Sequence, residues 1–247
     1  MTALRVAIIA SILAALGTGL GGGLVAVFPR LSRALYDALL GFSAGVMLAA
    51  GSITLLGPAL ARNGIAAVSA GLLSGALFVF VLERVVPHLE PHFAPHISGP
   101  EKRLGLLMGA AITLHHVPEG LAVGVAFAAG EASLGIIVAV AIALQNIPEG
   151  LAIAVPLRAA GFTRLRATLW ALLSGVGQPF AAALGVGFVS IVGPMVPFAL
   201  ALAAGAMIFV ASDQLIPESR QRPEAKAPSL GLIAGFVLVA VLTKLFS

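Results

Sequence analysis

The stretch LHHVPEGLAVGV at residues 114–125 is followed by a second version of the same pattern, LQNIPEGLAIAV, at residues 144–155. Each version places a glutamate, a proline and side chains with metal-binding donor atoms among Ala, Val, Leu and Ile. A carboxylate at the centre of a bilayer costs about 2.5–3.5 kcal/mol on insertion scales, and such residues normally face a bundle interior or a wet cavity. Two versions of so costly a motif in neighbouring apolar segments indicate a shared function.

The composition indicates the class of protein. The chain has 247 residues, of which 60% are hydrophobic and 10% charged, and its mean hydropathy is +1.09. Soluble domains have about 25% charged residues, so this chain lacks the polar side chains needed to cover a soluble surface. The sequence therefore predicts an all-α polytopic membrane protein, with residues 1–247 forming a single transmembrane domain embedded in the lipid bilayer.

Apolar runs of about 20 residues, long enough to cross a bilayer core, recur along the whole chain. They predict eight membrane-spanning helices, and an even number places both chain termini on the same side of the membrane. Most connections are short, but residues 83–103 are expected to form a longer, histidine-containing loop. The expected spans are residues 6–28, 35–57, 64–82, 104–127, 134–155, 168–191, 198–216 and 229–246.

The distribution of Lys and Arg predicts the orientation in the membrane. Eleven of the 14 basic residues lie in loops on one face, whereas Arg5, Arg62 and Lys244 lie on the other. Because positively charged loops stay in the cytoplasm, we expect the loop at 83–103 to be cytoplasmic and both termini to lie outside. The pI near 10.3 follows from these loops and does not indicate nucleic-acid binding.

Donor side chains occupy matching positions in the two motifs. In each motif, one lies four residues before the glutamate on the same helix face, and another lies three residues before it. Neither of the two spans that carry a motif contains Lys or Arg, and two buried carboxylates repel each other unless they are protonated or bridged by a cation. Imidazole with carboxylate suits Zn²⁺, Fe²⁺ and Mn²⁺, so a bound divalent ion is predicted. The donor residues are His115, His116 and Glu119 in the first motif, and Gln145, Asn146 and Glu149 in the second.

The prolines and glycines of the motifs favour convergence of the two helices. Pro118 and Pro148 cannot donate a backbone hydrogen bond, so each is expected to kink its helix and free a carbonyl oxygen. Gly120 and Gly150 allow another backbone to approach closely. Taken alone, an HxxxE pair in a membrane helix could be a hydrogen-bonded pair without a metal, and a proline could serve only to kink the helix. A kink does not need a glutamate each time, so the duplication favours a cation site.

With these paired motifs, the chain resembles bacterial members of the ZIP (Zrt-, Irt-like protein) family of divalent metal transporters. The resemblance covers essentially the whole chain and rests on HxxPEG and QNxPEG in consecutive spans. It implies that spans 1–3 and 6–8 form inverted repeats around spans 4 and 5, and that the protein is a homodimer of the inner membrane. It also implies ATP-independent uptake of zinc, and of Cd²⁺, Fe²⁺, Mn²⁺ or Co²⁺, into the cytoplasm.

The resemblance also assigns roles to individual residues. His116 and Asn146 match an adjacent second site, and Met47 matches a methionine that lines the pathway, although without the resemblance Met47 would be taken as a core residue. Gln178 stands where bacterial relatives often carry a glutamate, and Asn146 where they often carry an aspartate. This loss of negative charge favours one tightly bound ion, and the sequence leaves occupancy of the second site open. The residues matching the primary transport site are His115, Glu119, Gln145 and Glu149.

Two further polar features carry open alternatives. The segment PHLEPHFAPH at residues 87–96 is expected to be extended, because prolines disfavour a helix. Its histidines either bind metal weakly near the cytoplasmic exit or belong to a solvated linker. Asp213 either lines the pathway or caps the cytoplasmic end of its span. The histidines of the segment are His88, His92 and His96.

The same sequence weighs against other functions. An intramembrane metalloprotease usually needs HExxH, whereas the first motif has no second histidine four residues on. A phosphate-binding P-loop is absent, so the chain has no sequence basis for ATP hydrolysis. A metal-selective channel with the same ligands is the main alternative, and a sensor would not need eight spans. Alternating access fits inverted repeats, no resident cofactor or enzymatic reaction is predicted, and protonation of the ligands should make uptake depend on pH.

Overall fold

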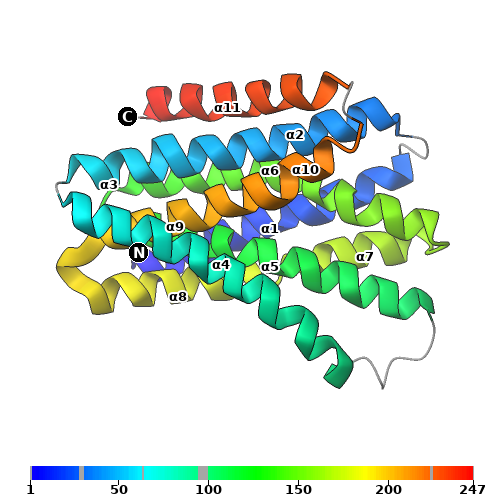
Figure 1. Ribbon diagram of the computed structural model, residues 1–247, viewed down its shortest axis with the longest axis horizontal. Coiled ribbons are helices and arrows are strands. Elements are labelled where there is room, and N and C mark those ends of the chain that lie inside the picture. Colours follow the sequence, from blue (N-terminus) through cyan, green and yellow to red (C-terminus); the bar gives the residue numbers. More distant parts are fainter. Residues whose placement is uncertain (1, 28–30, 63, 94–99, 223–224, 247) are drawn as a thin grey trace.

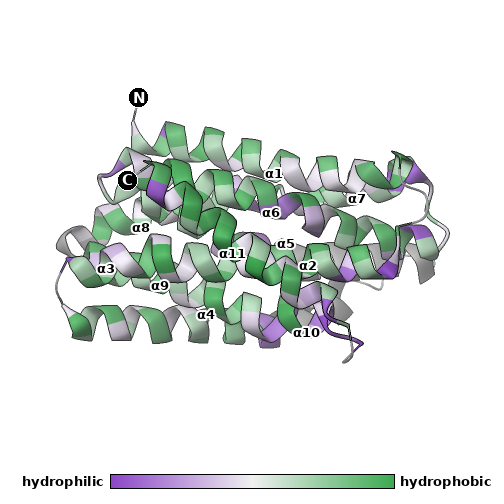
Figure 2. Cartoon of the chain, turned by 90° about the horizontal axis from the view of Figure 1, so that it is seen from above, coloured by the Kyte–Doolittle hydropathy of each residue, from purple (hydrophilic) through white to green (hydrophobic). Residues whose placement is uncertain are grey.

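The computed structural model describes residues 2–27, 31–62, 64–93, 100–222 and 225–246, with side chains described in the same ranges apart from 86–93, 100–113, 192 and 194. Within these ranges the chain forms helices joined by short connections, and no strand occurs. Figure 1 shows the helices as an elongated bundle with both termini at the same end. Figure 2 shows apolar residues along the helices, with hydrophilic residues gathered mainly toward their ends.

The elements divide between the two halves of the chain. The first half comprises α1 (Ala3–Val27), α2 (Arg33–Ala49), the π-helical turn η1 (Ala50–Leu56), α3 (Gly57–Ala61), α4 (Ile65–Phe93) and α5 (Pro100–Ala128). The second half comprises α6 (Ala132–Ala159), α7 (Arg164–Ser174), α8 (Gly177–Val192), the 3₁₀ turn η3 (Gly193–Met195), α9 (Val196–Val210), the π-helical turn η4 (Ala211–Leu215), α10 (Ile216–Ser219) and α11 (Ala227–Phe246).

Consecutive elements combine into eight rods, numbered here as spans 1–8. Span 2 is α2–η1–α3, span 6 is α7–α8 with a break at Gly175 and Val176, and span 7 is α9–η4–α10. Seven of the eight rods are long and apolar enough to cross a bilayer, judged on the described residues. The remaining rod, α5, can be judged only from Leu114 onward, where its side chains are described. The predicted all-α polytopic fold is confirmed.

The pairing of the spans shows an internal repeat. Span 1 packs along span 5 (α1 with α6), and span 4 packs along span 6 (α5 with α8). Span 2 packs along span 8 (α2 with α11), and span 3 along span 7 (α4 with α9). Suppose that spans 1, 2 and 3 are exchanged with spans 6, 7 and 8 in that order, and span 4 with span 5. Each of these packed pairs then becomes another of the four. Because successive spans alternate in direction, the two three-span units are inverted relative to each other.

Spans 2 and 7 carry a second sign of this repeat. Each contains a π-helical turn, η1 or η4, followed directly by a short helix with a proline near its start, Pro58 or Pro217. A π-helical turn inserts an extra residue into the helix ladder and is often found at functional sites. The chain thus interrupts the same span of each repeat in the same way.

The spans form two groups, which we call the first bundle (spans 1, 4, 5 and 6) and the second bundle (spans 2, 3, 7 and 8). Glycines allow close packing within each bundle, as expected where lipid removes any hydrophobic preference for helix contact. A Cβ added at Gly150 would lie 1.9 Å from the carbonyl oxygen of Thr18, and one at Gly75 would lie 1.9 Å from that of Leu202. The boundary between the bundles runs where α2 meets α6 and α5 meets α9.

The backbone corrects one prediction from the sequence. The segment at 87–96 was expected to be extended, but α4 continues without interruption to Phe93, and α5 begins at Pro100. A proline removes one backbone hydrogen bond, which kinks a helix without always ending it, so prolines near the end of a long helix need not stop it. His88 and His92 are therefore four residues apart on a helical backbone, and His96 lies outside the described residues.

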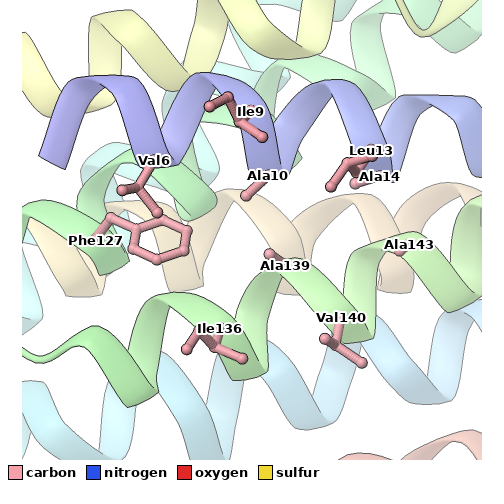
Figure 3. Close-up of a pocket in the computed structure, with 10 residues that line it drawn as sticks. All are labelled: Val6, Ile9, Ala10, Leu13, Ala14, Phe127, Ile136, Ala139, Val140 and Ala143. Atoms are coloured by element: carbon pink, nitrogen blue, oxygen red, sulfur yellow. The ribbon is translucent and has the colours of Figure 1, made fainter. Parts of the chain in front are cut away.

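A cavity of about 350 Å³ lies between α1 and α6 (Figure 3). Every residue that lines it is apolar, so it offers no side-chain ligand for a cation. Several of its lining residues are exposed on the surface of the bundle, including Ile9 and Leu13. The lining residues are Val6, Ile9, Ala10, Leu13, Ala14, Phe127, Ile136, Ala139, Val140 and Ala143.

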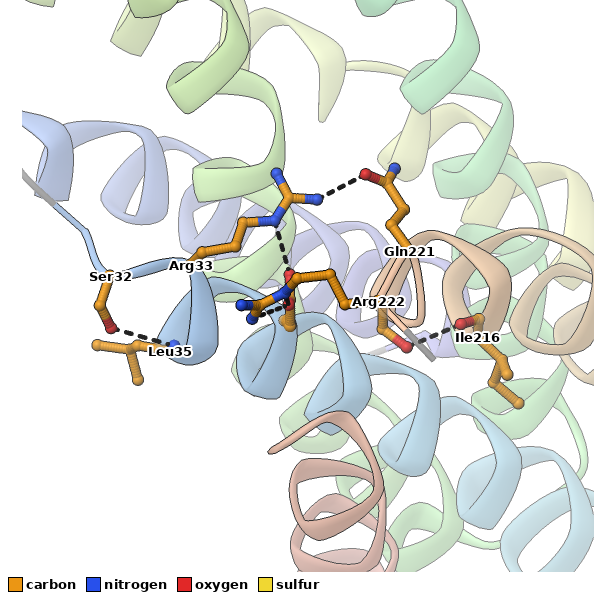
Figure 4. Close-up of polar contacts among 8 residues, drawn as sticks. Ser32, Arg33, Leu35, Ile216, Gln221 and Arg222 are labelled. Carbon is orange, nitrogen blue, oxygen red and sulfur yellow. Dashed lines mark hydrogen bonds and ion pairs between the residues drawn. The ribbon is translucent and has the colours of Figure 1, made fainter. Parts of the chain in front are cut away.

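A buried carboxylate fixes one end of the second bundle (Figure 4). Asp37 on α2 is fully buried and forms ion pairs with Arg33, at 3.0 Å, and with Arg222, at 2.7 Å. Arg33 also donates a 2.6 Å hydrogen bond to the side-chain oxygen of Gln221. These contacts tie the start of α2 to the segment that follows α10. Burial of the charge is offset because both carboxylate oxygens face a guanidinium group.

Candidate metal site

The two PEG motifs meet in the first bundle, where α5 lies against α6. His116, Glu119 and Glu149 each offer a donor atom, and these three atoms all lie within 4.8 Å of one another. Their side chains are 0%, 0% and 4% exposed, so the cluster is closed to its surroundings. Ligands of a single zinc ion lie at about 2.0–2.2 Å from the metal, so a small adjustment would let one ion contact all three residues.

Gln145 joins the two helices at this cluster. Its side-chain nitrogen donates a 2.8 Å hydrogen bond to one carboxylate oxygen of Glu119, and both side chains are fully buried. The bond places an amide of the second motif beside the carboxylate of the first. Glu149 lies one turn further along α6, on the same face as Gln145. The predicted convergence of the two motifs is therefore present in the structure.

Several buried polar atoms of the cluster and of its neighbours His115 and Gln145 have no hydrogen-bond partner among the described residues. Buried polar atoms nearly always have a partner, and an unpaired buried charge is costly. From Leu114 to its end, where side chains are described, α5 contains no Lys or Arg, and the one in α6, Arg158, lies in its last turn. A cation bound at the cluster would satisfy the unpaired oxygens of Glu119 and Glu149 together. These atoms are Nε2 of His115, Oε2 of Glu119, Oε1 of Gln145, and Oε1 and Oε2 of Glu149.

The two neighbouring histidines are placed differently. His116 belongs to the three-residue cluster, and its Nε2 lies 3.1 Å from the hydroxyl oxygen of Thr18 on α1. His115 lies outside that cluster, although its Nε2 is also buried. The assignment of His115 to a primary site and of His116 to a second site stays a prediction. The geometry gives His116 at least as direct a relation to both glutamates.

Two of the residues considered for a second site, Asn146 and Gln178, form a neutral amide pair. The side-chain nitrogen of Asn146 donates to the side-chain oxygen of Gln178 at 3.1 Å and to the main-chain carbonyl of Ala14 at 2.9 Å. Asn146 and Gln178 are fully buried. Spans 1, 5 and 6 therefore meet through hydrogen bonds between uncharged groups, beside the charged cluster.

Two other predicted residues lie in the second bundle. Met47 is fully buried on α2, the helix that contacts α6 across the bundle boundary. Asp213 is exposed within η4, and its neighbour Gln214 donates a hydrogen bond to Glu83 on α4. The pathway roles of Met47 and Asp213 stay predictions.

Two residues that sequence reasoning missed also contact the site. Thr18 lies beside His116, and the hydroxyl of Ser43 on α2 donates a 2.8 Å hydrogen bond to the main-chain carbonyl of Gln145. Both are fully buried. Each is a small polar residue next to glycine or alanine inside an apolar span, and that pattern was the available signal.

Comparison with known proteins identifies the family of the chain. The family model described as ZIP zinc transporter matches residues 101–243. The zinc transporter GufA of Myxococcus xanthus is 40% identical over 245 residues, which cover 95% of this chain and 96% of that protein. The zinc transporter ZIPB of Bordetella bronchiseptica is 38% identical, with 91% and 76% covered. The human zinc transporter ZIP11 is 32% identical, with 90% and 92% covered.

Proposed function

Because the chain belongs to the ZIP family of zinc transporters, we propose that it carries Zn²⁺ into the cytoplasm through the buried cluster on α5 and α6. The observation that carries this proposal is the grouping of His116, Glu119 and Glu149, in which three carboxylate oxygens of the two glutamates have no hydrogen-bond partner among the described residues. The two glutamates would neutralise a divalent ion. Related ions such as Cd²⁺, Fe²⁺, Mn²⁺ and Co²⁺ suit the same donors.

The metal is the substrate, and the residues of the chain replace its water shell. Imidazole nitrogen and carboxylate oxygen are common zinc ligands, and the side-chain oxygen of Gln145 is available once its amide turns toward the ion. The neutral Asn146–Gln178 pair adds no charge to attract a second ion. We therefore propose a carrier that holds one ion at a time, with no enzymatic step.

The arrangement of the bundles supports alternating access. Every proposed ligand on α5 and α6 belongs to the first bundle, and the second bundle contacts these helices across one boundary. Movement of one inverted unit against the other is a common transport mechanism in membrane proteins built of such repeats. With eleven basic residues on the opposite face, the end that holds both termini would lie outside the cell. The membrane would be the inner membrane, and the working protein a homodimer.

The direct test is uptake of Zn²⁺ and Cd²⁺ by proteoliposomes containing the full chain. Glu119→Gln and Glu149→Gln keep the side-chain volume but remove the charge, so each should abolish saturable uptake. Glu218→Gln, which changes an exposed carboxylate on α10, is the matched control and should leave uptake unchanged. Wild-type uptake in both buried variants would refute the proposed site. Ohmic currents that do not saturate with metal would identify a channel.

A further inference from the structure

Ser43 makes a contact that neither transport motif contains. It lies on α2 in the second bundle, it is fully buried, and its hydroxyl donates to the main-chain carbonyl of Gln145 on α6 at 2.8 Å. The two residues are 102 positions apart in the chain. This bond therefore joins the second bundle to the helix turn that carries the ligands of the first.

A serine inside a helix usually satisfies its hydroxyl within the same helix, by bonding the carbonyl four residues earlier. Ser52, in the same span, does this: its hydroxyl donates to the carbonyl of Leu48 at 2.5 Å. Ser43 instead bonds a carbonyl of another helix. Its bond therefore fixes one helix relative to another, whereas the bond of Ser52 is local.

The rest of α2 holds Ser43 in a defined position. Gly41 and Gly45 pack against the backbone of α11, where an added Cβ would lie 2.1 Å and 2.0 Å from carbonyl oxygens. Ser43 lies two residues from each of them, which places it on the opposite side of a helix with 3.6 residues per turn. The close α2–α11 pair therefore presents the Ser43 hydroxyl toward α6.

The acceptor end of the bond leads to the metal cluster. The backbone at Gln145 sets the position of its side chain, which in turn donates to Glu119 at 2.8 Å. The next residue, Asn146, is held on its other side by Ala14 and Gln178. Pro148 removes the backbone donor that would otherwise bond the carbonyl of Leu144, so this turn of α6 has one fewer internal restraint. Contacts from neighbouring helices therefore matter more here than in an ordinary helix turn.

We propose that Ser43 is a positioning residue for the transport site, supplied by the bundle that holds none of the motif ligands. This inference rests on the proposed function. Ser43 fixes the carbonyl of Gln145, and through it the Glu119–Gln145 pair, in the conformation described here. Because the bond crosses the boundary between the bundles, relative movement of the bundles would break it. The bond thus couples the geometry of the ligands to the position of the second bundle.

The test measures Cd²⁺ binding to the purified full-length protein by titration calorimetry, together with its thermal unfolding. A net hydrogen bond of about 0.5–1.5 kcal/mol corresponds to a change of about two- to tenfold in Kd, so Ser43→Ala should weaken binding by that factor. Ser43→Thr keeps the hydroxyl and should bind Cd²⁺ with the wild-type Kd. Ser52→Ala removes a local bond from the same span and should also leave the Kd unchanged.

A purely structural role for Ser43 would lower Tm without changing the Kd of folded protein, and that result would overturn the inference. Equal weakening in Ser43→Thr would overturn it too, because side-chain volume would then explain the effect. If Ser43→Ala does not fold, Ser43→Val takes its place with the same expected direction, because it is close in size to Ser43→Thr but has no hydroxyl to donate. Glu119→Gln separates the two hypotheses: if it binds Cd²⁺ normally, the proposed site itself is wrong.

Discussion

We expect the amide pair of Asn146 and Gln178 to limit the site to one ion. Both side chains are buried and neutral, and they bond to each other at 3.1 Å. Asn146→Asp together with Gln178→Glu would place two more carboxylates beside Glu119 and Glu149. We expect the wild type to bind one Cd²⁺ ion and the double variant two, because opposite charge is needed to hold a second cation. Calorimetric stoichiometry, checked by elemental analysis of the purified complex, distinguishes these outcomes.

The matched control for this prediction exchanges one neutral side chain for another. Gln178→Asn keeps the amide but shortens the side chain, so it should leave the stoichiometry at one ion. Two ions in the wild type would contradict the argument from charge. One ion in the charged double variant would show that this group of side chains cannot be opened to a metal.

The site residues that could be predicted from the sequence are those with a donor atom inside one of the two repeated motifs. Glu119, Gln145 and Glu149 could be placed on facing sides of two helices from spacing alone. Thr18 and Ser43 could not, because their partners lie 98 and 102 positions away and only packing brings them together. Spacing also could not show which of His115 and His116 points toward the glutamates. Neighbouring residues on a helix point about 100° apart, and a kink changes the direction of both side chains.

At the scale of elements, the pairing of Asp37 with two arginines should stabilise the joint between α2 and the segment after α10. Asp37 is 1% exposed, whereas Arg33 and Arg222 are 49% and 42% exposed. Removing one arginine leaves the buried carboxylate paired with one guanidinium group in place of two, so its buried charge is less well compensated. We therefore expect Arg222→Ala and Arg33→Ala each to lower Tm in detergent by a few degrees, and the double variant to lower it further.

A rescue experiment separates charge compensation from simple packing. Adding Asp37→Asn to the double variant removes the uncompensated charge and should restore part of the lost Tm. Arg220→Ala, which removes an exposed hydrogen bond to Ser229, should have little effect. If the triple variant is less stable than the double variant, the carboxylate stabilises this joint without the arginines, and the argument from charge is wrong.

The elements themselves were predictable wherever lipid determines the sequence. Eight apolar runs gave the number and approximate positions of the spans, because each run must cover the same bilayer thickness. Hydropathy does not report where a helix ends in water, so the continuation of α4 to Phe93 was missed. It also does not distinguish α-helical from π-helical turns, which depend on the hydrogen-bond ladder, so η1 and η4 were not predicted.

At the scale of the whole molecule, a second polar contact crosses between the bundles. Arg62, which follows α3 in the second bundle, pairs with Glu131 at 2.5 Å and donates to the carbonyl of Ala129 at 3.2 Å. Residues 129–131 join α5 to α6 in the first bundle. A surface ion pair of this kind contributes about 0–1 kcal/mol, so it can bias the position of the bundles without preventing their movement.

This contact permits a direct test of whether the bundles move against each other. The chain has no cysteine, so Arg62→Cys with Glu131→Cys can be joined selectively by a short bifunctional thiol reagent. Relative movement predicts that cross-linking stops Zn²⁺ uptake by proteoliposomes, whereas the same variant before cross-linking transports. Thr54→Cys with Thr243→Cys is the matched control, because those hydroxyls lie 3.2 Å apart within the second bundle, and a link there should leave uptake intact. Undiminished uptake through the cross-linked Arg62–Glu131 pair would mean that the ion crosses without separation of the bundles at this end, and alternating access would then need a different moving part.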